Sequence, residues 1–137
     1  MTQEEKQLLL KDLCARLPYC TKIYYYYLNK NLVEKEETRE LDFSDIETLK
    51  YNNECPQDSW CITVFKPYLR PMSSMTEEER KEFDCLTHTE FDSEDAEVYS
   101  DCVDELIDFY NAHHLDYRGL IDKRLALEAP EGMYKID

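Results

Sequence analysis

The sequence predicts an α+β fold, in which a small antiparallel sheet of three to four strands packs with an N-terminal helix and two C-terminal helices. A capping-box pattern, T-x-x-E at residues 2–5, opens the chain with a helix. Residues 21–65 contain TKIYYYYL and WCITVF, two runs rich in the aromatic and β-branched residues that favour strands. After residue 74 the apolar residues return to helical spacing. A sheet region flanked by helices is typical of the α+β class.

The length and composition suit one folded domain over residues 1–137. With 42% hydrophobic residues and many aromatic ones, the chain can bury a core and lacks the composition of a disordered segment. We divide it into a helix at 1–18, a tyrosine-rich sheet at 21–65, a proline-bounded crossing with helices at 66–121 and an extended tail at 122–137.

The first helix should begin at Thr2 and end at Leu17, because Pro18 disfavours helical geometry at the residue before it. Its apolar face comprises Leu9, Leu10, Leu13, Cys14 and Leu17. Cys14 is therefore interpreted as a small apolar residue of the core.

Four consecutive tyrosines dominate the first strand. Because side chains alternate across a strand, Tyr24 and Tyr26 should share one face, and Tyr25 and Tyr27 the other. Such rings can serve as a stacking platform for bases or sugars, or they can edge a sheet that helices cover on one side. The second interpretation is favoured, because only two lysines accompany the rings.

The remainder of the sheet region is less regular. Residues 34–40 are charged and suggest an exposed hairpin arm, and residues 37–43 are interpreted as a strand in preference to a short helix. Residues 52–59 contain a proline and two asparagines and indicate a loop. Residues 60–65 form the clearest core strand.

Two prolines should hold residues 66–74 extended, and a helix follows this crossing. Ser74–Glu77 and Thr76–Glu79 are overlapping capping boxes, so the helix should start near Thr76 and run to about Leu86. The final segment, residues 122–137, should be extended and dock through Leu125, Leu127 and Met133.

The segment from Asp92 to Ile121 is predicted to be an amphipathic helix that ends near His114, followed by a sharp turn. In that turn, Arg118 should pair with a carboxylate and Gly119 should supply backbone freedom. The apolar face of the helix comprises Val98, Cys102, Leu106, Phe109 and Tyr110. The opposite face is a row of six acids: Glu94, Glu97, Asp101, Asp104, Glu105 and Asp108.

The charge of the chain restricts its partners. Thirty-one acids against 16 bases give a net charge of −15, which repels nucleic-acid phosphates and anionic membrane surfaces. Residues 76–108 hold 14 of the acids and 2 of the bases, a net −12. This polarisation suits a solvated surface, and it also suits a basic protein partner whose nucleic-acid cleft the acids would occupy.

Several functional classes are disfavoured. Two glycines leave no room for a Walker A loop or a dinucleotide-binding turn, and no D-x-D-x-D-G pattern indicates an EF-hand. The start MTQEEKQLLL has acids where a secretory signal needs a basic region, and its apolar run is too short for such a signal. No apolar stretch approaches a membrane span. We therefore expect a cytoplasmic protein with reduced cysteines and without a cofactor.

A metal or catalytic site would have to use cysteine and histidine. The spacing C-x5-C occurs twice but C-x-x-C never, so a zinc site on Cys55, Cys61 and a distant histidine is the alternative and not the expectation. His113 and His114 are explained by a favourable interaction with a helix C-terminus. No residue is assigned to catalysis or to a metal.

Three segments resemble a known family. MTQEEKQLLLKDLCARLPY at 1–19, KPYLRPMSSMTEEER at 66–80 and NAHHLDYRGLIDKRLALEAPEGMY at 111–134 are similar to short uncharacterised proteins of gut Bacteroides and of their phages and prophages. Cys20 and Arg124 depart from the pattern, because glycine usually stands at both positions. The family has no established activity, so the resemblance implies only an intracellular, mobile-element setting and carries over no functional residue.

These observations lead us to expect a small acidic binding protein that acts by protein–protein contact. The contact residues would be the tyrosine run, the six acids, or both. A sharper version is an inhibitor of a host nuclease or other defence protein, in which the acids mimic a row of phosphates. A metal-binding or catalytic protein that uses cysteine and histidine is one alternative, and an oligomeric structural accessory protein is another.

Overall fold

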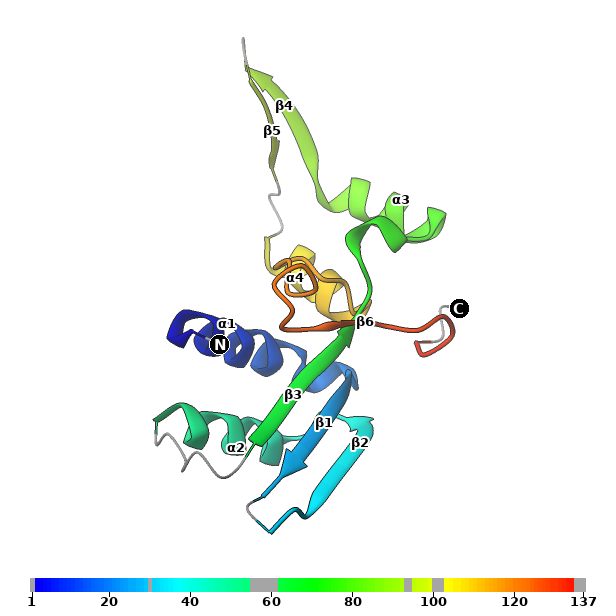
Figure 1. The fold of residues 1–137 in the computed structure, drawn as a ribbon. Coiled ribbons are helices and arrows are strands. Elements are labelled where there is room, and N and C mark those ends of the chain that lie inside the picture. Colours follow the sequence, from blue (N-terminus) through cyan, green and yellow to red (C-terminus); the bar gives the residue numbers. More distant parts are fainter. Residues whose placement is uncertain (1, 30, 55–61, 93–94, 100–102, 135–137) are drawn as a thin grey trace.

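The chain folds as the predicted α+β class, with a four-stranded mixed sheet and helices before and after it (Figure 1). The computed structural model describes residues 2–29, 31–54, 62–92, 95–99 and 103–134. In these ranges the elements are α1 (Gln3–Arg16), η1 (Leu17–Tyr19), β1 (Lys22–Leu28), β2 (Glu34–Glu40), α2 (Phe43–Glu54), β3 (Ile62–Leu69), η2 (Met72–Ser74), α3 (Glu77–Leu86), β4 (His88–Asp92), β5 (Asp95–Tyr99), α4 (Val103–Ala112) and β6 (Leu127–Glu128).

Helix α1 starts at the predicted capping box. The Glu5 backbone N–H donates to the Thr2 hydroxyl at 3.1 Å, and the Thr2 N–H donates to the Glu5 carboxylate at 3.1 Å. These two bonds satisfy donors that a helix start otherwise leaves unpaired. Leu9 and Leu13 are fully buried, but Cys14 is exposed, so its assignment to the core was wrong. The buried face turns towards Asp12 and Arg16 instead.

The main sheet has the strand order β2-β1-β3-β6. Strand β1 pairs antiparallel with both β2 and β3, and β3 pairs parallel with β6. Tyr25 lies opposite Phe65, and their rings are 5.1 Å apart. Tyr24 lies opposite Lys66 and Tyr26 opposite Val64, on the other face of the sheet. The predicted division of the tyrosines between two faces is therefore confirmed.

Helices α1 and α2 cover one face of the sheet (Figure 1). The core between them and the sheet is formed by Leu9, Leu13, Ile23, Leu41, Ile46, Leu49 and Phe65. Tyr25 packs against this cluster. Each fully buried aliphatic or aromatic side chain contributes about 1.5–3 kcal/mol, so this layer dominates the stability of the N-terminal half.

Residues 37–43 are only partly the strand that the sequence predicted. Strand β2 ends at Glu40, and α2 begins at Phe43. The Asp42 carboxylate accepts the Asp45 N–H at 3.3 Å, and the Asp45 carboxylate accepts the Asp42 N–H at 3.0 Å. This reciprocal pair caps α2 as a capping box does. The aspartate version of that pattern is the signal that the sequence analysis missed.

Strand β3 is longer than the predicted 60–65. It runs through Pro67 to Leu69, so the first part of the supposed crossing belongs to the sheet. Pro67 lacks an N–H, and β6 pairs only with the two residues after it, Tyr68 and Leu69. Trp60 and Cys61 lie outside the described residues.

The long helix predicted from Asp92 to His114 is wrong over its first part. Residues 88–92 and 95–99 form the antiparallel hairpin β4–β5, which extends away from the main sheet (Figure 1). Helix α4 covers only Val103–Ala112. Like charges three or four residues apart destabilise a helix, and the sequence places Glu94, Glu97 and Asp101 at this spacing. These acids therefore disfavour a helix in the first part of the segment. Helix α3 is confirmed, with its capping box at Thr76 and Glu79.

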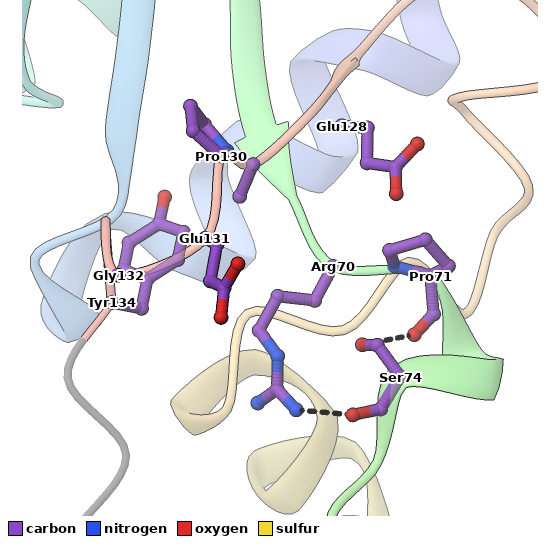
Figure 2. Close-up of a pocket in the computed structure, with 9 residues that line it drawn as sticks. Arg70, Pro71, Ser74, Glu128, Pro130, Glu131, Gly132 and Tyr134 are labelled. Atoms are coloured by element: carbon purple, nitrogen blue, oxygen red, sulfur yellow. Dashed lines mark hydrogen bonds between the residues drawn. The ribbon is translucent and has the colours of Figure 1, made fainter.

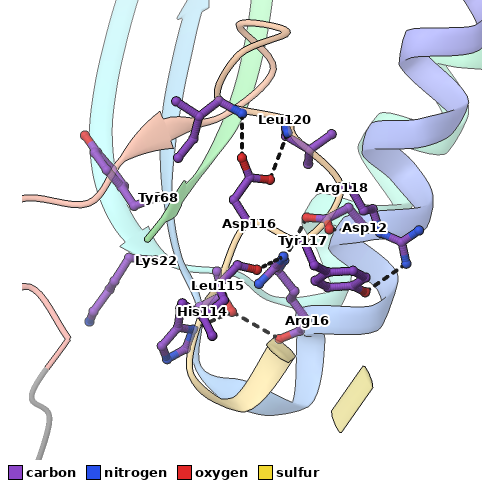
Figure 3. Close-up of polar contacts among 12 residues, drawn as sticks. Asp12, Arg16, Lys22, Tyr68, His114, Leu115, Asp116, Tyr117, Arg118 and Leu120 are labelled. Carbon is purple, nitrogen blue, oxygen red and sulfur yellow. Dashed lines mark hydrogen bonds and ion pairs between the residues drawn. The ribbon is translucent and has the colours of Figure 1, made fainter. Parts of the chain in front are cut away.

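A buried ionic network joins α1 to the loop after α4 (Figure 3). Asp12 and Arg16 have no exposed surface, and the Arg16 Nε donates to the Asp12 Oδ2 at 2.8 Å. Arg118 reaches the other carboxylate oxygen of Asp12 at 3.1 Å, which confirms its predicted carboxylate partner. The Arg16 Nη2 donates to the Leu115 carbonyl at 2.7 Å. Helix α1 thus holds the loop after α4.

The C-terminal segment docks on the end of β3, but it is not the extended tail predicted for residues 122–137. Residues 121–124 and 131–132 form turns, and strand β6 is two residues long. Leu125 is buried in a second core cluster with Leu69, Leu120 and Ala126, while Leu127 and Met133 are half-buried. Gly119, at φ +71°, turns the chain into this segment. Among the described residues, no helix is long and apolar enough to cross a membrane.

Replacement of Asp12 tests the buried ionic network. Asp12→Ala leaves Arg16 buried without its counter-ion, so we expect a loss of about 3–5 kcal/mol in the free energy of unfolding, measured by urea denaturation. Asp104→Ala, on the exposed surface of α4, is the matched control and should change stability by less than about 0.5 kcal/mol. Equal small effects for both variants would contradict the role given to Asp12.

Cys20 and Arg124 test a backbone constraint. Both residues have positive φ, 56° and 63°, in the left-handed region that side chains disfavour. Cys20→Gly and Arg124→Gly should each raise the free energy of unfolding by about 0.5–1 kcal/mol. Ala15→Gly, inside α1, is the control and should lower it by a similar amount. Destabilisation by all three glycines would show that the left-handed backbone costs nothing at these two sites.

Candidate functional site

The face of the sheet opposite α1 and α2 is the candidate site, and we call it the tyrosine face. The alternation of the strands places on it Tyr24 and Tyr26 of β1 and Tyr68 of β3. The same alternation adds the charged residues Lys22, Glu34, Glu36, Glu40 and Lys66. All three tyrosines are half-buried, which leaves part of each ring open to solvent.

Carboxylates of the edge strand β2 hold the hydroxyls of Tyr24 and Tyr26. The Tyr24 hydroxyl donates to the Glu36 carboxylate at 3.1 Å. Desolvation, and then this hydrogen bond to Glu36, raise the pKa of Tyr24 above its ordinary value. The pKa of Tyr26 is raised by desolvation and by Glu34. Both rings therefore stay neutral and present fixed positions beside negative charge.

The hairpin that joins β1 to β2 carries an exposed apolar tip. Leu32 is 81% exposed and Val33 is 55% exposed. Leu32 also has a φ of +60°, which is costly for a residue with a side chain. The Asn29 side chain fixes the turn, because its carbonyl oxygen accepts the Val33 N–H at 3.0 Å. A strained apolar residue in full contact with water has no evident structural role.

The predicted contact tyrosines do not all reach this surface. Tyr25 lies on the helix-covered side, packs against the core and carries the Arg39 guanidinium 5.3 Å above its ring. Tyr27 shares the side of Tyr25 by alternation and is half-buried. Tyr68 was not predicted. Its place could be found only from the pairing of β3 with β1, which the local sequence does not specify.

The six predicted acids do not form one row. Asp104, Glu105 and Asp108 lie exposed on α4, where Asp108 also accepts a hydrogen bond from the Tyr19 hydroxyl at 3.2 Å. Glu97 lies in strand β5, so it is not on that helix. Glu94 and Asp101 lie outside the described residues. Among the described residues, α4 therefore carries three of the six predicted carboxylates.

The cysteine and histidine residues offer no assembled site among the described residues. No group of three or more His, Cys, Asp or Glu side chains there could hold a metal ion. Cys14, Cys20 and Cys85 are free and exposed. Cys55, Cys61 and Cys102 lie outside the described residues, so the zinc alternative that uses the first two stays a prediction.

A second polar cluster joins β3, α3 and α4. Arg70 donates to both carboxylate oxygens of Glu79, at 2.8 and 2.7 Å, and the His113 Nδ1 lies 2.8 Å from the same carboxylate. The hydrogen bonds from Arg70, then that from the Thr76 N–H, lower the pKa of Glu79 to about 2 against the opposing effect of burial. Sequence analysis had recognised Glu79 only as the acid of a capping box.

A cavity of about 280 Å³ lies beside this cluster (Figure 2). Its walls come from Arg70, Pro71, Ser74 and the C-terminal segment from Glu128 to Tyr134. Both terminal nitrogens of Arg70 are already engaged, by Glu79, by the His113 carbonyl and by the Ser74 carbonyl. The Tyr134 hydroxyl is engaged as well, with the backbone of Lys22 and Tyr68. These bonds occupy the guanidinium and the tyrosine hydroxyl of the cavity, and the carboxylates of Glu128 and Glu131 are its remaining charged groups.

Comparisons with protein-family models, with curated proteins and with solved structures found no match to this chain.

The acid limb of the stability curve tests the Arg70–Glu79 pair. The folded-state pKa of Glu79, about 2, lies below its ordinary value of 4.5, so its contribution to stability is complete above pH 4.5 and is lost as the pH falls towards 2. Glu79→Gln should therefore cost about 2 kcal/mol at pH 7 and flatten this limb. Glu78→Gln, on the exposed side of α3, is the control that should leave the curve unchanged. An unchanged acid limb in Glu79→Gln would refute the pairing.

Proposed function

We propose that this chain is a small acidic binding protein that acts by protein–protein contact through the tyrosine face. The observation that supports it best is the asymmetry of the sheet. Helices α1 and α2 cover the side of Ile23 and Tyr25, while the side of Tyr24 and Tyr26 carries half-exposed aromatic rings. Solvated sheet faces usually carry polar side chains, so a cluster of aromatic rings there favours a binding role.

The chemistry of the tyrosine face suits a basic partner. Tyrosine gives a large contact area at a low cost in side-chain entropy, and it is enriched among residues that dominate binding energy. Glu34 and Glu36 stand beside the two rings, and the whole chain carries a net charge of −15. Charge of this sign steers a positively charged protein towards the surface and slows encounter with nucleic acid.

The apolar tip of the β1–β2 hairpin extends the contact surface in this proposal. Leu32 and Val33 lie in the turn between β1, which supplies Tyr24 and Tyr26, and β2, which supplies their carboxylates. Burial of an exposed leucine side chain contributes about 1.5–3 kcal/mol, a large share of the energy of one interface. The partner would thus cover both the rings and the tip.

The setting of this binding protein follows from the family resemblance. The three segments at 1–19, 66–80 and 111–134 suggest a phage or prophage protein that works in the cytoplasm of its host. A host defence protein is the partner that this setting favours. The reduced acidic row of Asp104, Glu105 and Asp108 supports a second candidate, an inhibitor that occupies the nucleic-acid cleft of such a protein.

A capture experiment with two matched variants separates these two candidates. The tagged chain is incubated with host lysate at about 0.05 M and about 0.3 M salt, which screens exposed charges to different extents. Tyr24→Thr combined with Tyr26→Thr removes the rings and keeps strand propensity. Asp104→Asn, Glu105→Gln and Asp108→Asn together remove the charges of α4. We expect a basic partner that is weakened by salt, lost with the tyrosine variant and kept by the α4 variant.

Leu32→Asn adds a control for folding. Asparagine adopts positive φ more readily than leucine, so this variant should be as stable as the parent or up to about 1 kcal/mol more stable, and yet bind at least about tenfold more weakly. Loss of the partner with the α4 variant alone would refute the tyrosine face and support the inhibitor. A salt-insensitive partner kept by every variant would refute both candidates.

A further inference from the structure

Tyr134 fastens the C-terminal segment to the sheet at the ends of β1 and β3. Its hydroxyl accepts the Lys22 N–H at 2.8 Å and donates to the Tyr68 carbonyl at 2.7 Å. It thus bridges backbone groups of two neighbouring strands just past Pro67, which has no N–H to offer. Burial raises the pKa of Tyr134 to about 12, so this bridge stays neutral at every pH considered below.

The ring of Tyr134 lies flat on the imidazole of His114. Their centroids are 3.7 Å apart and the planes are inclined by 14° (Tyr134 is labelled in Figure 2, and His114 in Figure 3). The backbone of His114 is fixed from the other side, because its carbonyl accepts the Arg70 N–H at 2.7 Å and its φ is +58°. The backbone of His114 is therefore held in place, and its imidazole is positioned by two side chains, the Tyr134 ring and the Thr21 hydroxyl.

The surroundings of His114 oppose a positive charge. Its Nδ1 lies 3.2 Å from the Thr21 hydroxyl, which is neutral. The charged groups that act on it are Arg16 from α1, Arg70 from the end of β3 and the adjacent His113, and all of them disfavour protonation. Glu79, the carboxylate of this region, is bound to Arg70 and His113. Burial first, and then these cations, lower the pKa of His114 to about 4.

We propose that His114 and Tyr134 form an acid-sensitive latch, in which protonation of His114 releases residues 129–134 from the sheet while the rest of the chain stays folded. A protonated His114 can be hydrated only if a side chain that covers its ring moves away. Tyr134 is the group that can withdraw at the lowest cost, because the described residues 129–134 make few hydrogen bonds to the rest of the chain. Apart from Tyr134, the described contacts of this segment are local, except for the bond from the Ala129 N–H to the Leu69 carbonyl at 2.8 Å.

Release would change two surfaces of the molecule. The cavity of about 280 Å³ would open, since the segment from Ala129 to Tyr134 forms one of its walls. The Lys22 N–H and the Tyr68 carbonyl would also become free at the edge of the tyrosine face. The latch does not depend on the proposed binding function, because it follows from contacts within the chain.

The size of the effect follows from linkage between protonation and docking. With a pKa of about 4 when the segment is docked, and at most the ordinary 6.5 when it is released, the docking equilibrium weakens by up to about 30-fold between pH 7.5 and pH 5.0. Arg16, Arg70 and His113 stay in place on release, so about 30-fold is the upper limit. The sign is that of a depressed histidine pKa: docking is strongest above pH 6.5 and is lost as the pH falls towards 4. At pH 5.0 carboxylates of ordinary pKa remain mostly ionised, so their titration contributes little.

Amide hydrogen exchange of the intact chain at pH 7.5 and pH 5.0, corrected for intrinsic rates, tests the latch. We expect protection of the Lys22 amide and of residues 129–134 to fall up to about 30-fold at pH 5.0, while the amides of α1 keep theirs. Unchanged protection of the segment at pH 5.0 would overturn the proposal. Simultaneous loss of protection in α1 would overturn it too, because release would then be global unfolding.

Two variants assign the effect to His114. His114→Phe keeps a flat ring for Tyr134 but cannot be protonated, so the segment should stay protected at both pH values. His113→Gln removes the neighbouring imidazole and should keep the pH response. The reverse outcome, a response kept by His114→Phe or lost in His113→Gln, would overturn the assignment. If His114→Phe does not fold, His114→Gln replaces it, and the absence of a pH response is again the expected result.

Discussion

The fold depends on the pair of charges that α1 buries at Asp12 and Arg16. Two fully buried ions are costly unless each is paired and hydrogen-bonded. Their positions in α1 therefore fix the positions of the groups that pair with them. Asp12 brings in Arg118, and Arg16 brings in the Leu115 carbonyl (Figure 3). The first helix and the loop after the last helix are thereby held together. This pairing acts together with the β3–β6 strand pair and the second core cluster, which also join the sheet to the C-terminal segment.

The same physical rule operates at the Arg70–Glu79–His113 cluster. There a carboxylate from α3 is enclosed by a guanidinium from the end of β3 and an imidazole from the end of α4. Acidic residues of this chain are therefore not only a solvated coat. A few of them, buried and paired, set the positions of the helices that follow the sheet, and the exposed remainder gives the surface its sign.

The asymmetry of the sheet links this architecture to the proposed binding function. Since α1 and α2 occupy one side, the amphipathic tyrosines of β1 are divided into structural and solvent-facing rings. Tyr25 belongs to the core, where Phe65 and Arg39 contact it. Tyr24 is held by a carboxylate of the edge strand, so its hydroxyl has a fixed position in the free chain. Ordered aromatic side chains lose little entropy on binding, which favours a role in recognition.

The sequence by itself determined the α+β class, the starts of α1 and α3, the alternation of the tyrosines and the carboxylate partner type of Arg118. The helix starts depend on residues close in the chain, and the alternation of the tyrosines depends on the fixed period of a strand. The partner type of Arg118 follows from the charge of its own side chain. Only the tertiary structure decided which side of β1 is covered, that Tyr68 joins Tyr24 and Tyr26, and that residues 88–99 form a hairpin. Asp12 and Arg118 are 106 residues apart in the chain. Strand β3 pairs with β1, although β2 and α2 separate the two strands in the sequence. Contacts of this kind are selected by packing and by the cost of burying charge, and no local pattern specifies them.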